Sequence, residues 1–202
     1  MYDSDIISGI RTALAPLGCN ITLRVISNPL TPLGLSMIEC VEDIAGCNKH
    51  LAVILESSEV KNEIRIMRDS LPTGITFRCA PTGNFLAPFL QALLNAAGEG
   101  LILDEGLLKE AAAISGPKHL HTCVGARNAA GPRIVQIIDE ITLSNPMITN
   151  TVVEASELMK CSCLHTAKGN ASHAEPIVAL DNRVICDGCE SAADLIRILQ
   201  SC

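Results

Sequence analysis

The chain of 202 residues is 48% hydrophobic and carries a formal net charge of −7 at pH 7. This hydrophobic content is enough for the core of one domain or of two small ones, so the composition excludes a disordered chain. The acidic charge and the absence of a run of Lys and Arg argue against binding to nucleic acid or to an anionic membrane surface, and we expect neither partner.

The sequence predicts a cytoplasmic protein. Met1 to Asp5 contains no basic region followed by an apolar core, so no secretory signal is expected. The uncharged residues between Arg78 and Glu99 contain prolines, glycines and amides, which favour a buried helix over a membrane span. In a reducing compartment the ten cysteines are more typical of buried thiols, metal ligands or redox sites than of a disulfide framework. Four of them are predicted to be buried as small hydrophobic residues: Cys19, Cys40, Cys79 and Cys123.

Caps, apolar spacing and turn residues predict the elements of the first half. Asp3 caps a first helix that ends near Pro16, and the capping-box pattern at Ser36 opens a second helix that ends at Gly46. The continuous apolar run 50–56 predicts a strand that is covered on both faces. The remaining elements are a strand 20–27, a hairpin of strands 63–68 and 75–79, and a helix 84–97.

A boundary follows the next predicted helix, 104–115, which ends at Gly116 and Pro117. The same order then returns as strand 118–125, helix 132–144, strand 147–154, a short helical or irregular segment 156–168, strands 176–181 and 183–186, and helix 190–201. We therefore expect two units, residues 1–116 and 117–202. The predicted fold is α/β, with two tandem thioredoxin-like units, each a mixed four-stranded sheet flanked by helices.

Several short motifs resemble one family. They are Phe77-x-x-x-Pro81-x-Gly83, the strand-turn-helix from Thr122 through Pro132, Asn145-Pro146, and Glu175-Pro176-Ile-Val-Ala-Leu. This pattern resembles the N-terminal tandem domain of the flavoprotein subunit of alkyl hydroperoxide reductase and, more distantly, the archaeal protein disulfide oxidoreductases. The resemblance implies redox exchange with a flavoprotein disulfide reductase or a peroxiredoxin-like protein, and it requires no cofactor in this domain.

The resemblance also implies a lost site. The family's redox turn is Cys-x-x-Cys-Pro, and its two cysteines fall here on Asn128 and Gly131. An acidic residue of the family falls on Phe85. Pro132 keeps its place in the first turn of the helix, and Pro176 matches the cis-proline that faces the dithiol. The second unit is therefore expected to keep the scaffold of the redox site without its thiols.

Cys186-Asp-Gly-Cys189 is the one Cys-x-x-Cys sequence in the chain, between a predicted strand and the last helix. A thiol near a helix N-terminus has a lowered pKa, so Cys189 is a candidate nucleophile and the pair a candidate relocated redox site. Cys161 and Cys163 are possible resolving thiols. The alternative is that these cysteines are structural or incidental.

Two further hypotheses remain open. The chain is either a non-catalytic binding module that keeps the groove beside Pro176, or it holds a structural zinc ion through Cys161, Cys163, Cys186 and Cys189. The Cys-x-Cys spacing is tighter than that of most zinc sites, which counts against the zinc hypothesis. His119 and His121 alternate along a strand and are expected on a solvated or hydrogen-bonded face.

Overall fold

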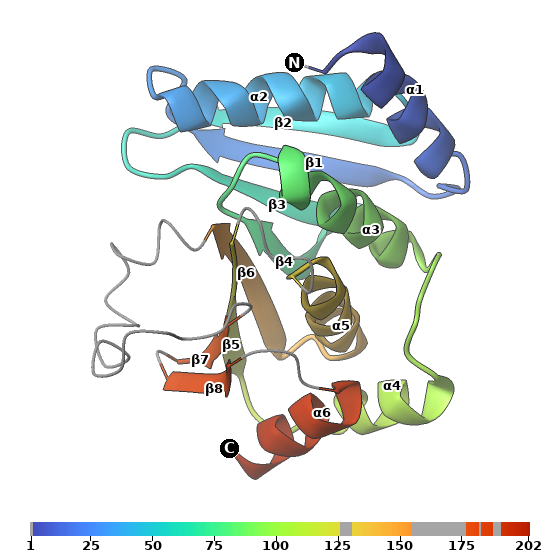
Figure 1. The fold of residues 1–202 in the computed structure, drawn as a ribbon, viewed down its shortest axis with the longest axis vertical. Helices are drawn as coiled ribbons and strands as arrows, with labels where there is room; N and C mark the ends of the chain where they lie inside the picture. Colours follow the sequence, from blue (N-terminus) through green and yellow to red (C-terminus); the bar gives the residue numbers. More distant parts are fainter. Residues whose placement is uncertain (1, 126–130, 155–176, 182, 188–190) are drawn as a thin grey trace.

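In the computed structural model, residues 2–125, 131–154, 177–181, 183–187 and 191–202 are described. Figure 1 shows the elements that they form. These are α1 (Ser4–Ala13), β1 (Ile21–Ser27), α2 (Pro32–Ala45), β2 (Leu51–Ser57), β3 (Glu63–Arg68), β4 (Leu71–Phe77), η1 (Gly83–Phe85), α3 (Leu86–Ala97), α4 (Glu105–Ala112), β5 (Lys118–Val124), α5 (Gly131–Ser144), β6 (Ile148–Glu154), β7 (Ile177–Leu180), β8 (Arg183–Asp187) and α6 (Ala192–Ser201). The predicted segment 156–168 lies outside the described residues.

The eight strands form one continuous mixed sheet in the order β2-β1-β3-β4-β6-β5-β7-β8. Within each half, the first strand pairs in parallel with the second and antiparallel with the third, which in turn pairs with the fourth. The halves are joined by a short parallel contact between β4 and β6, from Ile75↔Asn150 to Phe77↔Val152. The predicted α/β fold of two tandem thioredoxin-like units is confirmed, while the boundary between residues 116 and 117 stays a prediction.

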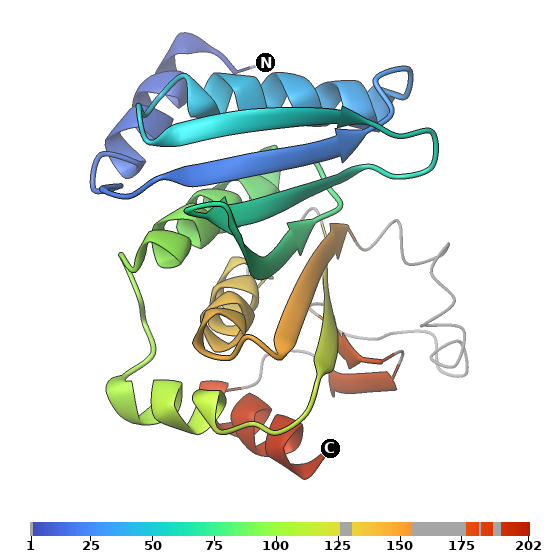
Figure 2. The same cartoon turned by 180° about the vertical axis from the view of Figure 1, so that it is seen from behind.

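Helices α2, α3 and α5 cover one face of the sheet, and none of the described helices lies on the opposite face over β1, β3, β4 and β6 (Figures 1 and 2); we call this the helix-free face. Paired residues of neighbouring strands point to the same face. One row crosses all eight strands on the helix-covered side: Leu55, Val25, Ile64, Phe77, Val152, Thr122, Val178 and Cys186. This register places Cys186 on the side of the sheet that faces the core.

The buried apolar residues form two clusters, and each cluster includes some residues from both halves of the chain. The first surrounds Phe77 and Phe89, whose rings meet edge to face with centroids 5.1 Å apart. The second surrounds Ile138 of α5 and Leu195 of α6, and it includes Cys186. Aromatic pairs in this geometry add to the free energy gained from burial. Both clusters combine side chains of strands with side chains of helices, so their burial packs a layer of helices onto the sheet.

The second helix begins earlier than the sequence predicted. It starts at Pro32, and its N-cap is Thr31, whose Oγ1 accepts a hydrogen bond from the Gly34 N–H at 3.1 Å. Ser36 lies inside the helix, so the prediction that it opens α2 was wrong. The physical reason is that proline fits the first helical turn, where its missing N–H costs nothing.

The hairpin between β3 and β4 is also tighter than predicted. Its turn consists of Asp69 and Ser70, with φ of 47° and 69°, and β4 begins at Leu71 rather than at Ile75. Two consecutive positive φ values are typical of the turn that matches the twist of two-residue hairpins. The residues Leu71 to Gly74, which looked like loop, are therefore strand.

The prediction that the strand after His50 is covered on both faces was wrong. β2 lies at an edge of the sheet and pairs with β1 among the described strands. Ile54 and Leu55 are about half exposed, at 50% and 49%. An apolar run indicates a strand, but its burial depends on where the strand lies in the sheet.

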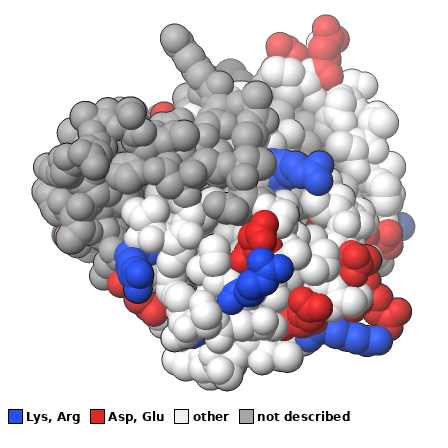
Figure 3. Space-filling model, turned by 60° about the horizontal axis from the view of Figure 1, so that its bottom comes forward, with Lys and Arg blue, Asp and Glu red and all other residues white. Residues whose placement is uncertain are grey.

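Burial of three predicted cysteines is confirmed. Cys40, Cys79 and Cys123 are buried, whereas Cys19 is half-buried against the first cluster. None of the helices in the described ranges is both long and apolar enough to cross a bilayer. At the end of the molecule where α4 and α6 lie, acidic and basic side chains are interspersed (Figure 3).

Candidate functional site

The turn before α5 is the expected position of the family's dithiol. Asn128 lies outside the described residues, but Gly131 is buried as the first residue of α5. A Cβ added at Gly131 would lie 2.2 Å from Cγ1 of Val124, the last residue of β5. No side chain, cysteine included, fits there unless Val124 moves. Pro132 follows as the second residue of the helix, half-buried, where proline is well tolerated.

A buried acid lies farther along the same helix. Asn150 of β6 accepts a hydrogen bond from the Thr122 hydroxyl at 2.8 Å and donates its amide to Oδ1 of Asp139 at 2.9 Å. Oδ2 of Asp139 has no hydrogen-bond partner among the described residues. Burial raises the pKa of Asp139 to about 8; the Asn150 hydrogen bond opposes this shift and the nearby Glu140 adds to it. Asp139 is therefore mainly protonated at neutral pH.

The sequence reasoning missed Asp139. Eight residues of helix separate it from Gly131, which corresponds to about 12 Å along the axis. This distance is too long for Asp139 to transfer a proton directly to a group in the turn. The signal that would have found it is an adjacent acidic pair, Asp139 and Glu140, inside an otherwise apolar helix.

The matching turn of the first unit precedes α2 and is closed by hydrogen bonds. Asn62 accepts from the Asn28 N–H at 2.9 Å, and the Thr31 hydroxyl donates to the Asn28 carbonyl at 2.8 Å. A Cβ at Gly34 would lie 2.0 Å from the same carbonyl oxygen. This turn contains no cysteine, so its side chains stabilise the start of the helix and offer no redox chemistry.

The structure describes one member of the predicted Cys186–Cys189 pair. Cys186 lies on β8, in register with Val178, and is 2% exposed within the second apolar cluster. Helix α6 begins a few residues later, capped by Ser191, which accepts from the Asp194 N–H at 3.2 Å. The other predicted site residues, Cys161, Cys163, Pro176 and Cys189, lie outside the described residues. The pairing of Cys186 with Cys189 therefore stays a prediction.

The described residues include no group of three or more His, Cys, Asp or Glu side chains that would hold a metal ion. Three of the four cysteines of the zinc hypothesis lie outside those residues, so this hypothesis also stays a prediction. Cys79 does not offer a reactive alternative, because burial, and secondly the charge of Glu154, raises the pKa of its thiol well above the ordinary value.

Phe85, where the sequence resemblance predicts that the family's acidic residue is lost, is buried in the first apolar cluster. An apolar ring there can neither take up a proton nor stabilise a thiolate. On the helix-free face, Nδ1 of His119 lies 2.9 Å from Oγ1 of Thr149. The pKa of His121 is lowered by partial burial and then by Arg78 and His119, opposed by Asp181. The predicted hydrogen-bonded histidine face is confirmed.

No family model matches the chain. Its sequence is 23% identical over 163 residues to AhpF, a component of the alkyl hydroperoxide reductase of Staphylococcus epidermidis, and the match covers 81% of this chain. Its fold matches the N-terminal domain of the alkyl hydroperoxide reductase AhpF of Enterococcus faecalis with a TM-score of 0.85, covering 98% of this chain and 100% of that domain, at 16% identity. The chain resembles AhpF in sequence and the N-terminal domain of AhpF in fold.

One further sequence match and one further structural match extend this picture. An NADH dehydrogenase of Bacillus subtilis is 25% identical over 122 residues, which are 59% of this chain and 24% of the relative. A protein disulfide oxidoreductase from Aeropyrum pernix has the same fold, with a TM-score of 0.82 and 13% identity, over 98% of this chain and 92% of that one. The chain spans 31% of the length of the AhpF relative, so the likeness concerns one region of that longer protein.

Proposed function

We propose that the chain is a thiol-disulfide redox module in which Cys186 and Cys189 replace the dithiol of the turn before α5. The observation that supports this proposal is the contact between Gly131 and Val124, which leaves no room for a thiol at the usual position. Cys186 lies at the end of β8, close in sequence to the capped N-terminus of α6. Related redox sites likewise combine a buried thiol with a second one beside a helix start.

The proposed exchange transfers two electrons. The thiolate of Cys189 attacks one sulfur of a partner's disulfide, which breaks the partner's S–S bond and releases its other sulfur as a thiolate. Cys186, deprotonated, then attacks the sulfur of Cys189 and releases the partner's second thiol. The partner disulfide becomes a dithiol, the module's dithiol becomes a disulfide, and two protons balance the two electrons. Since Cys186 is buried, it acts as the resolving thiol and Cys189 as the attacking one.

The proposed partners follow from the likeness to AhpF. A flavoprotein disulfide reductase would reduce the Cys186–Cys189 disulfide, and a peroxiredoxin-like protein would take the electrons in turn. The module itself requires no cofactor for this exchange. Cys161 and Cys163 would then be additional resolving thiols.

Thiol trapping and mass spectrometry on the full chain test the redox proposal. We expect a disulfide between Cys186 and Cys189 at oxidising potential and two free thiols at reducing potential. Cys189→Ser should abolish this disulfide. Cys202→Ser, which removes an exposed cysteine, should leave the disulfide intact. Both thiols remaining free at oxidising potential would show that the pair is not a redox site.

A non-catalytic binding module is the second candidate, and the burial of Cys186 at 2% exposure favours it. In this case the pure protein reduces no insulin disulfide, although it keeps the fold. Turnover that Cys189→Ser abolishes would overturn this candidate. Metal analysis of the same sample separates both from the zinc alternative, which requires one zinc per chain and loss of metal in Cys186→Ser.

A further inference from the structure

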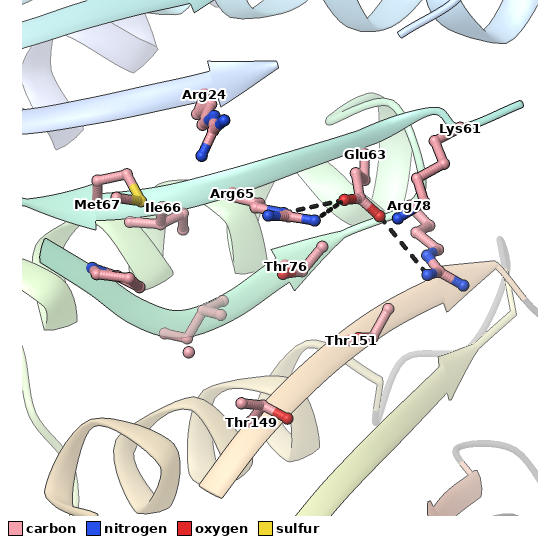
Figure 4. Close-up of a pocket in the computed structure, with 13 residues that line it drawn as sticks. Arg24, Lys61, Glu63, Arg65, Ile66, Met67, Thr76, Arg78, Thr149 and Thr151 are labelled. Carbon is pink, nitrogen blue, oxygen red and sulfur yellow. Dashed lines mark hydrogen bonds and ion pairs between the residues drawn. The ribbon is translucent and has the colours of Figure 1, made fainter. Parts of the chain in front are cut away.

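The helix-free face contains a pocket of about 320 Å³ where the two halves of the sheet meet (Figure 4). β3 and β4 pair at Arg65↔Thr76 and again at Met67↔Pro72, so three residues of β4 lie opposite one residue of β3. Such a bulge bends a strand. Beyond the bulge, β4 pairs with β6. The pocket lies along this bend, and its lining includes Thr149 and Thr151 of β6.

Basic side chains dominate the pocket. Among the described residues, its lining contains Arg24, Lys61, Arg65 and Arg78 but a single acidic residue, Glu63. A second carboxylate, that of Glu56, pairs with Arg24 of the pocket lining, with N–O distances of 2.6 and 3.0 Å. Counting both carboxylates, two positive charges remain in excess, in a chain whose formal net charge is −7. A local concentration of positive charge on an acidic protein attracts anions.

Carboxylates hold the arginines in fixed positions. The side chain of Glu63 is 3% exposed; its Oε1 accepts from Nε of Arg65 at 2.9 Å, and its Oε2 lies 3.6 Å from Nη2 of Arg78. Figure 4 shows Glu63 between these two guanidinium groups. Arg65 and Arg78 are nevertheless 39% and 49% exposed, so part of each group faces the solvent. Such positioned guanidinium groups lose little conformational entropy when an oxyanion binds.

Hydroxyl and apolar groups complete the site. Arg24, Arg65, Thr76, Thr151 and His121 form one row across the helix-free face, because each pairs in register with the next. Thr76 follows Arg65 in that row and Thr151 follows Thr76, and threonine hydroxyls are able to donate hydrogen bonds to an oxyanion. Met67 and Pro72 provide apolar surface at the other end of the pocket. The lining therefore offers one polar and one apolar half.

We propose that this pocket binds a small organic anion through a phosphate or carboxylate group, which Arg65, Arg78 and Lys61 hold while its apolar part contacts Met67 and Pro72. The row of threonines orients the oxyanion. This site lies on the face of the sheet opposite to α5 and Cys186, and the proposal does not depend on the redox function. Phosphate and carboxylate share the geometry that a guanidinium fork recognises, and the probes below distinguish them.

Isothermal titration calorimetry on the full chain tests the proposal with inorganic pyrophosphate and with citrate. Both probes are compared at the same ionic strength, and the comparison is repeated at a higher salt concentration. We expect saturable binding of at least one probe with a stoichiometry of one, weakened when the salt concentration rises. Binding of pyrophosphate alone identifies a phosphate site, and binding of citrate alone a carboxylate site. The absence of saturable binding by both probes would overturn the proposal.

Matched variants locate the binding. Lys61→Gln and Arg78→Gln should each weaken binding about tenfold, the effect of one lost charge-assisted contact. Lys109→Gln on α4 and Arg197→Gln on α6 remove the same charges from exposed positions far from the pocket and should not change the affinity. Lys61→Gln serves where Arg78→Gln unfolds the protein, because Lys61 is exposed and pairs with neither carboxylate. Equal affinities in all four variants would show that the anion binds elsewhere.

Discussion

Glu140 of α5 accepts a hydrogen bond from the backbone N–H of Leu103, at 2.8 Å, in the segment that connects α3 to α4. The same carboxyl group accepts from the Ile102 N–H at 2.9 Å and from the Asn95 amide of α3 at 3.4 Å. Glu140 is fully buried. One side chain of α5 therefore holds both α3 and the segment that connects α3 to α4.

We expect Glu140→Ala to lower the free energy of unfolding by about 3 kcal/mol, because it leaves buried N–H groups of the connecting segment without an acceptor. Glu140→Gln keeps the size of the side chain but turns one acceptor oxygen into a donor, so its effect should be smaller and of the same sign. Urea unfolding followed by circular dichroism measures both. Glu110→Ala on the exposed side of α4 is the control. Equal unfolding midpoints for Glu140→Ala and the control would contradict this role.

Asp139 makes the stability depend on pH. Its pKa rises from 3.8 in the unfolded chain to about 8 in the folded one, so the folded state binds one more proton between these values. The contribution of this proton is complete below pH 3.8 and is lost as pH rises through about 8. Within that window the free energy of unfolding falls by about 1.4 kcal/mol for each unit that the pH rises.

Asp139→Asn should remove this part of the slope, because the amide cannot ionise. Unfolding free energies of wild type and variant at several pH values give the difference directly. Asp69→Asn, at an exposed turn residue whose φ of 47° suits asparagine, should keep the wild-type slope. Parallel curves for wild type and Asp139→Asn would mean that folding does not raise the pKa of Asp139.

Gly131→Ala should destabilise the protein by about 1 to 3 kcal/mol, since the added methyl group collides with Val124. Val124→Ala opens the space, so Gly131→Ala should cost less stability in the Val124→Ala background than in the wild type. Gly9→Ala is the control, because α1 has open space there and alanine favours a helix. Thermal unfolding of the wild type, the two single variants and the double variant measures the coupling between the two positions. Strictly additive effects would exclude a direct contact.

Arg78 should control the titration of His121. Arg78→Gln removes one of the causes that lower the pKa of His121, so this pKa should rise, while partial burial keeps it below the ordinary value of 6.5. NMR titration of the imidazole signals measures the shift. Arg68→Gln removes an arginine of the neighbouring hairpin that does not contribute to the shift. An unchanged pKa in Arg78→Gln would place the two groups farther apart than the structure does.

Local signals predicted most of the elements. Asp3 and Asp104 cap α1 and α4 as their sequence context indicates, since an N-cap depends on a few neighbouring residues. The exposure of β2 was not predictable in this way, because an apolar run is the same in a central strand and at an edge. The start of α2 at Pro32 was misjudged because a capping-box pattern inside a helix looks like one at its start.

The candidate sites were harder to predict. The match of Gly131 to a cysteine of the family is a prediction from the sequence alone, but the contact that forbids a side chain there depends on the approach of β5 to α5. The pocket of the helix-free face depends on the register that aligns Arg24, Arg65 and Thr76 on three strands. Single-sequence patterns do not determine such a register. They gave no sign that basic side chains from separate strands of an acidic protein gather in one place.

The contact between β4 and β6 also makes the two ends of the sheet different from each other. Because the strand order repeats, β6 corresponds to β2 and β4 corresponds to β8, so the outer strands of the sheet are of the same two kinds as the strands that meet at its centre. When two units join through two different surfaces, one copy of each kind of surface is left at the outer ends of the pair. The fused chain therefore has two unlike outer strands, β2 and β8, and a third unit that paired in the same way would extend the row of strands.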